Sequence, residues 1–298
     1  LPEMLHCLRR ATWYISMTLA VAPNILEHET PELVIVAYEH GTFQRALIIE
    51  ASKRGIPTVA LQHGRIYSAY PDYAFGAISA KIEKGKFKIA DRTCVYNEEA
   101  ASILVKDFRF PRENVTVTGN WRYGNILQYR NKLDRLKLFE NYELDPKRTT
   151  VAILTGGIAG LDHLSGCLKA LDSLDLPLQI IVKPHPQRDQ HEIREFVRNG
   201  WRHPIRVEEV SLFNALFVAD FAISEYSNAI TEAMLLGCPV ILSDSRPQRL
   251  EFEYSEREGV IVASDPESIR QGVQSLACKG ERFREVMEGV SRFNSSYW

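Results

Sequence analysis

The fold of this chain is indicated by the segment Thr150-Val151-Ala152-Ile153-Leu154-Thr155-Gly156-Gly157, a short apolar run that stops at two glycines. An unbroken run rich in β-branched residues is typical of a parallel strand that is buried on both faces. Glycines directly after such a strand let backbone N–H groups come close to a ligand at the start of the next helix. The segment therefore predicts an α/β sheet with a ligand-binding edge.

The same pattern repeats on both sides of this segment. Short runs rich in Val, Ile and Thr alternate with helix-like stretches, which indicates parallel sheets covered by helices. We predict strands over residues 33–38, 57–61, 93–96, 115–118, 150–155, 178–183, 205–207, 221–224, 239–242 and 260–263. We predict helices over residues 43–54, 98–105, 191–199, 212–219 and 229–236.

The chain length indicates two domains, because 298 residues is about twice the usual domain size. A polar, basic stretch over residues 128–147 follows the fourth predicted strand, and a new strand begins soon after it. We predict an amino-terminal domain over 1–130, a linker over 131–148 and a carboxyl-terminal domain over 149–298. Since the first residue is leucine, we expect this chain to be part of a longer polypeptide.

Composition excludes several classes of protein. A hydrophobic fraction of 45% with 25% charged residues argues against disorder. The 36 basic and 38 acidic residues nearly cancel, so we expect no nucleic-acid partner. Five cysteines without a C-x-x-C pair argue against a disulfide framework or a structural zinc site. We expect a cytoplasmic protein, and a position at the inner face of a membrane stays open.

The most apolar early stretch covers residues 11–23. It is too short for a bilayer span, which needs roughly 20 residues. We expect a helix that packs in the core or at an interface, with an interfacial membrane helix as the alternative.

Three segments of the second half lie at the carboxyl ends of predicted strands, where open α/β sheets bind ligands. The first consists of Thr155, Gly156 and Gly157. It matches neither the G-x-G-x-x-G pattern of dinucleotide sites nor the Walker A loop, so NAD and ATP sites are not supported. We predict a backbone contact to a nucleotide here, and a plain tight turn is the alternative.

The second segment is Lys183-Pro184-His185-Pro186. Two prolines restrict the conformation of His185, so its ring is held in place to bind phosphate oxygens, and Lys183 adds positive charge. We count Lys183, His185 and Pro186 as donor-binding candidates. A rigid turn with an incidental histidine is the alternative.

The third segment contains Ser224, Ser227, Asn228 and Glu232. Ser224 ends a predicted strand, and Ser227 with Asn228 is placed to cap the next helix, whose amino end then offers N–H groups to an anion. Glu232 lies one turn into that helix, where it would accept both hydroxyls of a ribose. N-capping alone would also explain the serines.

The first half contributes Glu39, His40 and His63, which follow two successive predicted strands. Neighbouring parallel strands bring them to one sheet edge, where a carboxylate and two imidazoles form an acid/base cluster. A buried structural role is the alternative for either histidine. No ligand spacing for a metal and no G-x-S-x-G elbow occurs in the sequence, so we expect neither a metal nor a cofactor, and no covalent hydrolase.

In combination these segments resemble the GT-B glycosyltransferase superfamily, in which two Rossmann-like domains with parallel sheets face a cleft. The Lys183–Pro186 segment followed by Ser224-x-x-Ser227 is similar to the His-Pro and serine motifs of transferases with cytidine-activated donors. These include sialyltransferases, Kdo transferases and CDP-glycerol polymerases. The resemblance implies that His185, Ser224 and Ser227 bind the donor phosphate or cytidine.

A second resemblance concerns Val115-Thr116-Val117-Thr118-Gly119-Asn120, which is similar to a stretch near the hinge of UDP-GlcNAc 2-epimerases. The serine segment departs from the epimerase pattern, which is closer to Asp-Ser-Gly-Gly with paired glutamates. We also predict four strands before the hinge, whereas a GT-B amino-terminal domain usually has six or more. We therefore expect either that the first domain is truncated or that another module supplies its first strands.

The resemblance implies a metal-independent glycosyltransferase that moves a sugar, Kdo or a sialic-type acid, from a CMP-activated donor. The acceptor would be a surface polysaccharide or a glycolipid, and association with a membrane polysaccharide-synthesis complex stays open. Glu39 is the first choice for the base, His63 the second and His40 the third. The alternatives are a UDP-sugar GT-B transferase, a UDP-GlcNAc 2-epimerase-like enzyme and a non-catalytic binding module.

Overall fold

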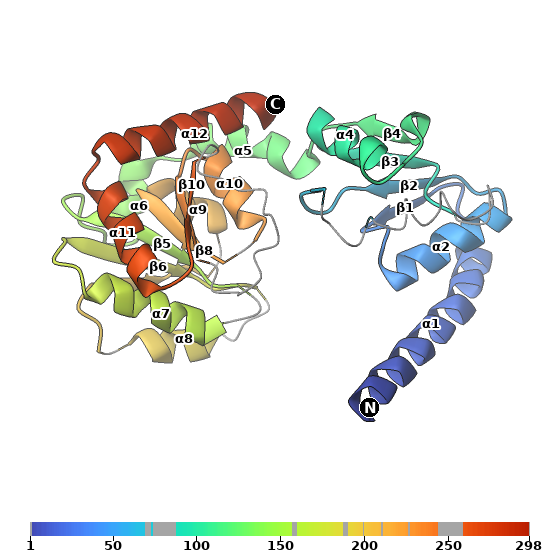
Figure 1. Cartoon of the computed structure of the whole chain (residues 1–298), viewed down its shortest axis with the longest axis horizontal. Helices are drawn as coiled ribbons and strands as arrows, with labels where there is room; N and C mark the ends of the chain where they lie inside the picture. Colours follow the sequence, from blue (N-terminus) through green and yellow to red (C-terminus); the bar gives the residue numbers. More distant parts are fainter. Residues whose placement is uncertain are drawn as a thin grey trace. The chain divides into compact units, whose positions relative to one another are not determined.

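The chain folds as two α/β units in a computed structural model, and we call Leu1–Asn120 unit 1 and Trp121–Trp298 unit 2. The structure describes residues 2–68, 73, 88–156, 160–186, 190–198, 200–209, 211–225, 227–243 and 259–297. Both units contain a parallel sheet with helices, which confirms the predicted α/β class (Figure 1).

Unit 2 begins earlier than the predicted carboxyl-terminal domain. Residues 131–148, which we predicted as a linker, contain helix α6 (Arg135–Asn141) and belong to unit 2. The reason is packing. Tyr123 and Ile126 of α5 (Trp121–Lys132) lie in the core of unit 2, and Leu138 of α6 packs against Ile181.

The sheet of unit 2 has six parallel strands in the order β10-β9-β8-β5-β6-β7. From β5 the chain steps outward through β6 to β7, then returns to the other side of β5 and steps outward through β8, β9 and β10. The order therefore reverses between β5 and β8. The strands are β5 (Thr149–Leu154), β6 (Leu178–Lys183), β7 (Ile205–Val207), β8 (Phe221–Ser224), β9 (Val240–Ser243) and β10 (Val260–Ala263).

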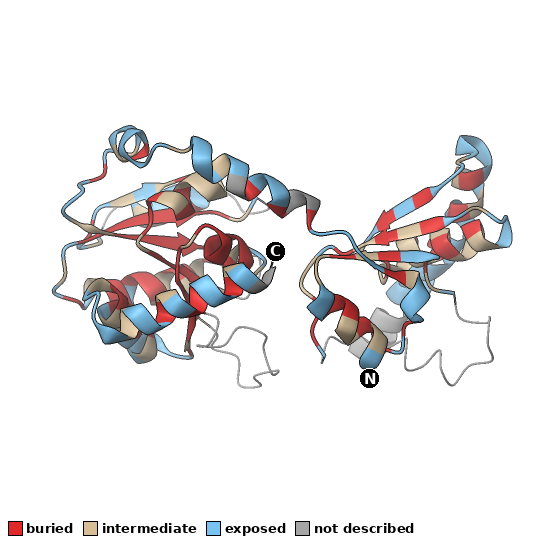
Figure 2. Ribbon diagram, turned by 90° about the horizontal axis from the view of Figure 1, so that it is seen from above, coloured by how far each residue is buried: buried red, intermediate tan, exposed pale blue. Residues whose placement is uncertain are grey.

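Helices cover both faces of this sheet, so its strands are mostly buried, with the edge strand β7 as the exception (Figure 2). Alternate residues of β5 face opposite layers: Val151 and Ile153 pack in one cluster, and Ala152 and Leu154 in the other. The first layer holds α7 (Gly160–Asp172), α8 (Gln190–Val197) and α11 (Pro266–Ala277). The second holds α5, α9 (Leu212–Val218) and α10 (Ala229–Leu235). Helix α12 (Glu281–Tyr297) contributes to both, with Val286 in the first cluster and Phe293 in the second.

Unit 1 has four parallel strands in the order β1-β2-β3-β4. When each new strand is added on the same side of the previous one, right-handed crossovers place all the connecting helices on one face of the sheet. Accordingly Val34, Val36 and Ala60 pack with α2, whereas Ile35 on the other face is 58% exposed. The elements are β1 (Val34–Ala37), α2 (Thr42–Lys53), β2 (Thr58–Leu61), β3 (Arg92–Val95), α4 (Glu98–Lys106), the 3₁₀ helix η2 (Arg112–Asn114) and β4 (Val115–Val117).

The apolar stretch near the amino terminus lies in a long helix, α1 (Pro2–Glu29), which packs on α2. Within residues 11–23, Thr18 and Ala22 are buried, whereas Trp13 is 66% exposed. No helix in the described part of the chain is long and apolar enough to cross a membrane.

An aspartate that precedes one strand anchors the start of the neighbouring strand in each unit. Asp91 Oδ2 accepts from the Thr58 N–H at 2.8 Å and from its hydroxyl at 2.9 Å. Asp220 Oδ2 accepts from the Thr150 N–H at 2.9 Å. Each carboxylate satisfies a strand-end donor that the parallel ladder leaves without a partner.

We predict that Asp91→Ala lowers the free energy of unfolding of unit 1 by about 1–3 kcal/mol, because it removes the acceptor of two buried Thr58 donors. Urea unfolding monitored by circular dichroism measures the change. Asp107→Ala, at an exposed site after α4, is the matched control. Equal stability of the two variants would contradict the anchoring role.

Candidate functional site

Two of the predicted segments of unit 2 are joined by hydrogen bonds at the carboxyl ends of β5 and β6. The Thr155 N–H donates to the Lys183 carbonyl at 3.1 Å, and the His185 N–H donates to Thr155 Oγ1 at 3.1 Å. Thr155 is buried, and His185 is half-buried. The threonine therefore fixes the backbone of the loop that carries the histidine.

The Lys183 side chain also supports the loop that carries His185. Its ammonium donates to the carbonyls of Pro184 at 3.0 Å and Glu209 at 3.2 Å. Burial lowers the pKa of Lys183, and the nearby Glu208 and Glu209 oppose that shift. Lys183 thus adds positive charge beneath the loop while its own donors are engaged by backbone carbonyls. Pro186 is exposed.

The serine segment lies at the end of β8 and the start of α10. The Ser224 hydroxyl is buried and donates to the Glu225 carbonyl at 2.7 Å. Ser227 Oγ accepts from the Ala229 N–H at 3.2 Å, so the serine provides the cap that the sequence predicts. Asn228 forms no side-chain cap bond.

Gly156 and Glu232 complete the predicted set that the structure describes, and Gly157 lies outside the described residues. Glu232 is buried on the first turn of α10. A Cβ atom at Gly156 would lie 2.1 Å from Glu225 Oε2, so any larger residue would require the Glu225 carboxylate to move. Glu225 therefore packs over the turn that follows β5.

Sequence reasoning missed three residues at this edge, Glu225, His163 and Cys167. His163 Nδ1 lies 4.0 Å from Glu225 Oε2, and Cys167 Sγ lies 3.4 Å from His163 Nε2. Burial lowers the pKa of His163, while the Glu225 charge raises it. Burial also raises the pKa of the Cys167 thiol to about 12, so it stays a neutral thiol.

The signal for these residues was present in the sequence. His163 and Cys167 are four residues apart on the helix after the glycine turn, and this spacing places them on one helix face. Glu225 directly follows Ser224. The pair of β5 and β8 is the point at which strand order reverses, and open α/β sheets bind ligands outside such a point.

In unit 1 the predicted acid/base residues follow β1 and β2. Tyr38 has a φ of +67°, an unfavourable backbone conformation at the end of β1. Glu39 is next in the chain and only 2% exposed, and Thr93 Oγ1 donates to its Oε1 at 3.3 Å. Burial raises the pKa of Glu39 to about 7, although Arg45, Thr93 and Ala90 act in the opposite direction.

The two histidines belong to an aromatic cluster with Tyr38 and Tyr73. The His40 ring lies 3.8 Å from the Tyr73 ring, and the His63 ring lies 4.3 Å from the Tyr38 ring, measured between centroids. The two imidazoles are 6.3 Å apart, and His63 is exposed whereas His40 is half-buried. The structure thus brings both histidines together, with the Glu39 carboxyl buried and His63 at the surface.

The comparisons with known proteins identify the family of the chain. A sequence model of the family described as UDP-N-acetylglucosamine 2-epimerase matches residues 11–298. The chain belongs to this family. Among the described residues no three His, Cys, Asp or Glu side chains gather as a metal site.

Two solved structures with a bound uridine nucleotide are similar to the chain. The S. aureus MnaA–UDP co-structure is 18% identical, with a TM-score of 0.64, over 94% of this chain and 76% of that one. The UDP-GlcNAc 2-epimerase from Neisseria meningitidis, bound to UDP-GlcNAc, is 17% identical, with a TM-score of 0.65, over 95% and 78%. At these identities the likeness establishes the fold, two Rossmann-like domains of the GT-B kind.

A curated relative, the processive diacylglycerol β-glucosyltransferase of Bacillus licheniformis, is 23% identical over 175 residues. The match covers 57% of this chain and 45% of that protein, so the chain spans less than half the length of this relative. The relationship to epimerases and glycosyltransferases is therefore confirmed. The cytidine-activated donor finds no support, and the epimerase alternative fits the family better.

The raised pKa of Glu39 predicts a pH dependence of stability. Because the folded chain binds this proton more tightly than the unfolded chain, the free energy of unfolding falls as pH rises from 4.5 to about 7. The loss from this group is on the order of 3 kcal/mol. Urea unfolding at several pH values should show a flatter profile for Glu39→Gln than for the wild type.

Glu32→Gln is the control, because Glu32 is exposed and also lies close to β1. If Glu39→Gln and Glu32→Gln gave the same profile as the wild type, Glu39 would not hold a proton near neutral pH.

Proposed function

We propose that the chain binds a UDP-activated N-acetylamino sugar and inverts the configuration at C2 of the sugar. Family membership supports this proposal, as do the two relatives whose structures contain UDP or UDP-GlcNAc. The nucleotide would lie at the carboxyl edge of the unit 2 sheet, against Thr155, His185 and the segment from Ser224 to Glu232.

One observation carries the placement of the nucleotide: the hydrogen bond between Thr155 Oγ1 and the His185 N–H, next to the reversal of strand order. This hydrogen bond fixes the backbone of His185 at the carboxyl edge of the sheet, where open α/β sheets bind ligands. A diphosphate needs such fixed donors, because they stabilise its charge without reorganising.

Epimerisation at C2 needs groups that remove a proton and return one to the opposite face of the sugar. Groups with a pKa close to the working pH are best suited to this task. Burial raises the pKa of Glu39 to about 7, and the imidazoles of His40 and His63 follow the ends of β1 and β2 as Glu39 follows β1. His63 is the exposed member, so in this proposal it contacts the substrate, with Glu39 as the buried proton-holding partner.

Glycosyl transfer is the second candidate, favoured by the match with the Bacillus licheniformis glucosyltransferase. The two functions differ in what they require. A transferase turns over only when a saccharide or lipid-linked acceptor is present, whereas an epimerase acts on the nucleotide sugar alone.

We predict that the chain converts UDP-GlcNAc to its C2 epimer in D₂O with deuterium incorporated at C2, and without an acceptor. Proton NMR follows both changes. His63→Gln and Glu39→Gln should lower turnover by about 10²–10⁴-fold while UDP affinity stays near that of the wild type. Consumption of UDP-GlcNAc only after addition of an acceptor would replace the epimerase proposal with glycosyl transfer.

We also predict that calorimetric titration finds tighter binding of UDP than of CMP, and that His185→Ala weakens UDP binding at least tenfold. The exposed His191 on α8 provides the control variant, His191→Ala. UDP affinity unchanged in His185→Ala would remove His185 from the nucleotide site, and tighter binding of CMP would restore the cytidine interpretation.

A further inference from the structure

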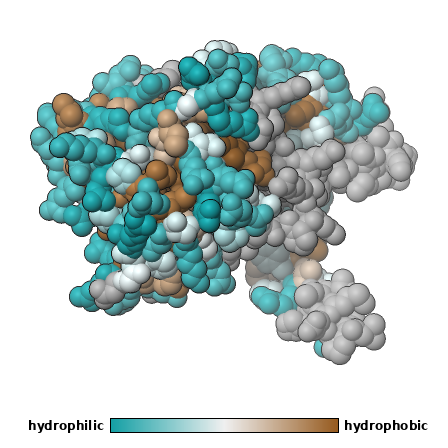
Figure 3. All heavy atoms as spheres, turned by 60° about the vertical axis from the view of Figure 1, so that its left-hand side comes forward, coloured by the Kyte–Doolittle hydropathy of each residue, from teal (hydrophilic) through white to brown (hydrophobic). Residues whose placement is uncertain are grey.

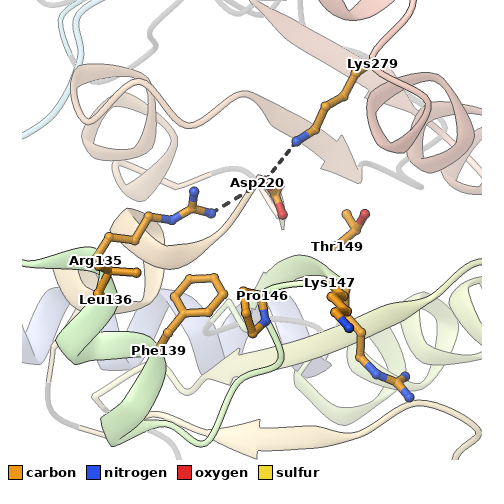
Figure 4. Close-up of a pocket in the computed structure, with 9 residues that line it drawn as sticks. Arg135, Leu136, Phe139, Pro146, Lys147, Thr149, Asp220 and Lys279 are labelled. Carbon is orange, nitrogen blue, oxygen red and sulfur yellow. Dashed lines mark ion pairs between the residues drawn. The ribbon is translucent and has the colours of Figure 1, made fainter.

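A cavity of about 280 Å³ lies at the amino-terminal ends of β5 and β8, within unit 2. Residues of α6, the loop before β5, the residue before β8 and the turn after α11 surround it (Figure 4). Strand β5 has six residues, so this cavity is about 20 Å from the carboxyl edge at a rise of 3.3 Å per residue. The function proposed above does not use it.

The lining of the cavity is strongly cationic. Four of its nine residues are Arg135, Lys147, Arg148 and Lys279, and its one acidic residue is Asp220. Arg135 and Lys279 reach Asp220 from opposite sides, at 3.6 and 3.5 Å (Figure 4). One carboxylate between two cations fixes their positions and leaves an excess of positive charge for an anion.

Both arginines are held in place by further contacts. Arg135 donates to the Val218 carbonyl at 3.0 Å and stacks over the Phe139 ring at 5.0 Å from its centroid. Arg148 donates to the Leu178 carbonyl at 3.2 Å. Preorganised guanidinium groups favour phosphate, whose oxygens match their paired donors. Arg148 also pairs with Asp145, at 3.7 Å between Nε and Oδ2. Lys147 forms no ion pair within the described residues.

One wall of the cavity is apolar, formed by Leu136, Phe139 and Pro146. Leu136 is 75% exposed, the one large hydrophobic side chain in the described part of unit 2 with such exposure. The face of unit 2 seen in Figure 3 is mainly hydrophilic, with limited hydrophobic areas. An exposed leucine beside a cationic cavity indicates a ligand with an organic group next to its anion.

The size of the cavity limits the ligand further. Pockets for drug-sized molecules usually measure about 300–1,000 Å³, and this one lies just below that range. This size favours a ligand smaller than a complete nucleotide sugar. We propose that this cavity binds a small phosphate monoester, with the phosphate between the four cations and its organic group against Leu136 and Phe139.

The test is calorimetric titration of the full chain with phenyl phosphate and, separately, with inorganic phosphate. The wild type should bind phenyl phosphate saturably and more tightly than inorganic phosphate. The double variant Lys147→Gln/Lys279→Gln should weaken phenyl phosphate binding at least tenfold. Lys169→Gln, at an exposed lysine on α7, should leave it unchanged.

His185→Ala separates this cavity from the carboxyl edge of the sheet, because it should retain phenyl phosphate binding. The proposal is overturned if binding is lost in His185→Ala and kept in the lysine double variant. It is also overturned if phenyl phosphate does not bind saturably, or binds no better than inorganic phosphate. The single variant Lys147→Gln disturbs no ion pair of the described residues and should weaken phenyl phosphate binding severalfold. It tests the proposal even if the double variant does not fold.

Discussion

The pairing of β5 with β6 on one side and β8 on the other is the constraint on which the rest of unit 2 depends. Thr149 to Leu154 pair with β6 over the full strand, and Val151 to Leu154 pair with β8. The strand order reverses between β5 and β8, and open α/β sheets bind ligands outside the carboxyl ends of the strands at such a point. Thr155, Gly156, Ser224 and Glu225 are placed there by strand register alone.

Burial then determines what these residues do. The strands are largely apolar on both faces, so buried polar side chains at the carboxyl edge of the sheet need hydrogen-bond partners within the protein. Thr155 bonds the His185 backbone, Lys183 bonds two carbonyls, and Ser224 bonds the Glu225 carbonyl. These contacts support the loops, which leaves His185 and the Glu225–His163 pair as the groups best placed to respond to a ligand.

Much of the fold could be predicted from the sequence, because continuous apolar strands between glycine or proline turns have a strong pattern. All ten predicted strands are present, and β6, β7, β8 and β10 have the predicted bounds. The domain boundary was harder, since polar helices such as α5 and α6 pack with few apolar residues. Tyr123 and Ile126 are enough to place α5 in unit 2.

The positions of the candidate residues at strand ends could be predicted from the sequence, whereas the directions of their side chains could not. The predicted strand ends place Glu39, His40 and His63 at one edge of the sheet. The sequence pattern does not reveal that Tyr38 has a positive φ, or that the glutamate after it is buried. The Glu225–His163–Cys167 contacts join a strand end to a helix 60 residues earlier in the chain, so they depend on tertiary packing. The nucleotide base could not be deduced, because the roles proposed for the motif residues concern phosphate and ribose, which uridine and cytidine nucleotides share.

Hydrogen–deuterium exchange of the full chain with and without UDP tests the central claim most directly. UDP should slow exchange in the backbone segments 153–156, 182–186 and 223–232, at the carboxyl ends of β5, β6 and β8. Protection confined to residues 135–149 and 219–221, at the opposite edge of the same sheet, would contradict the claim.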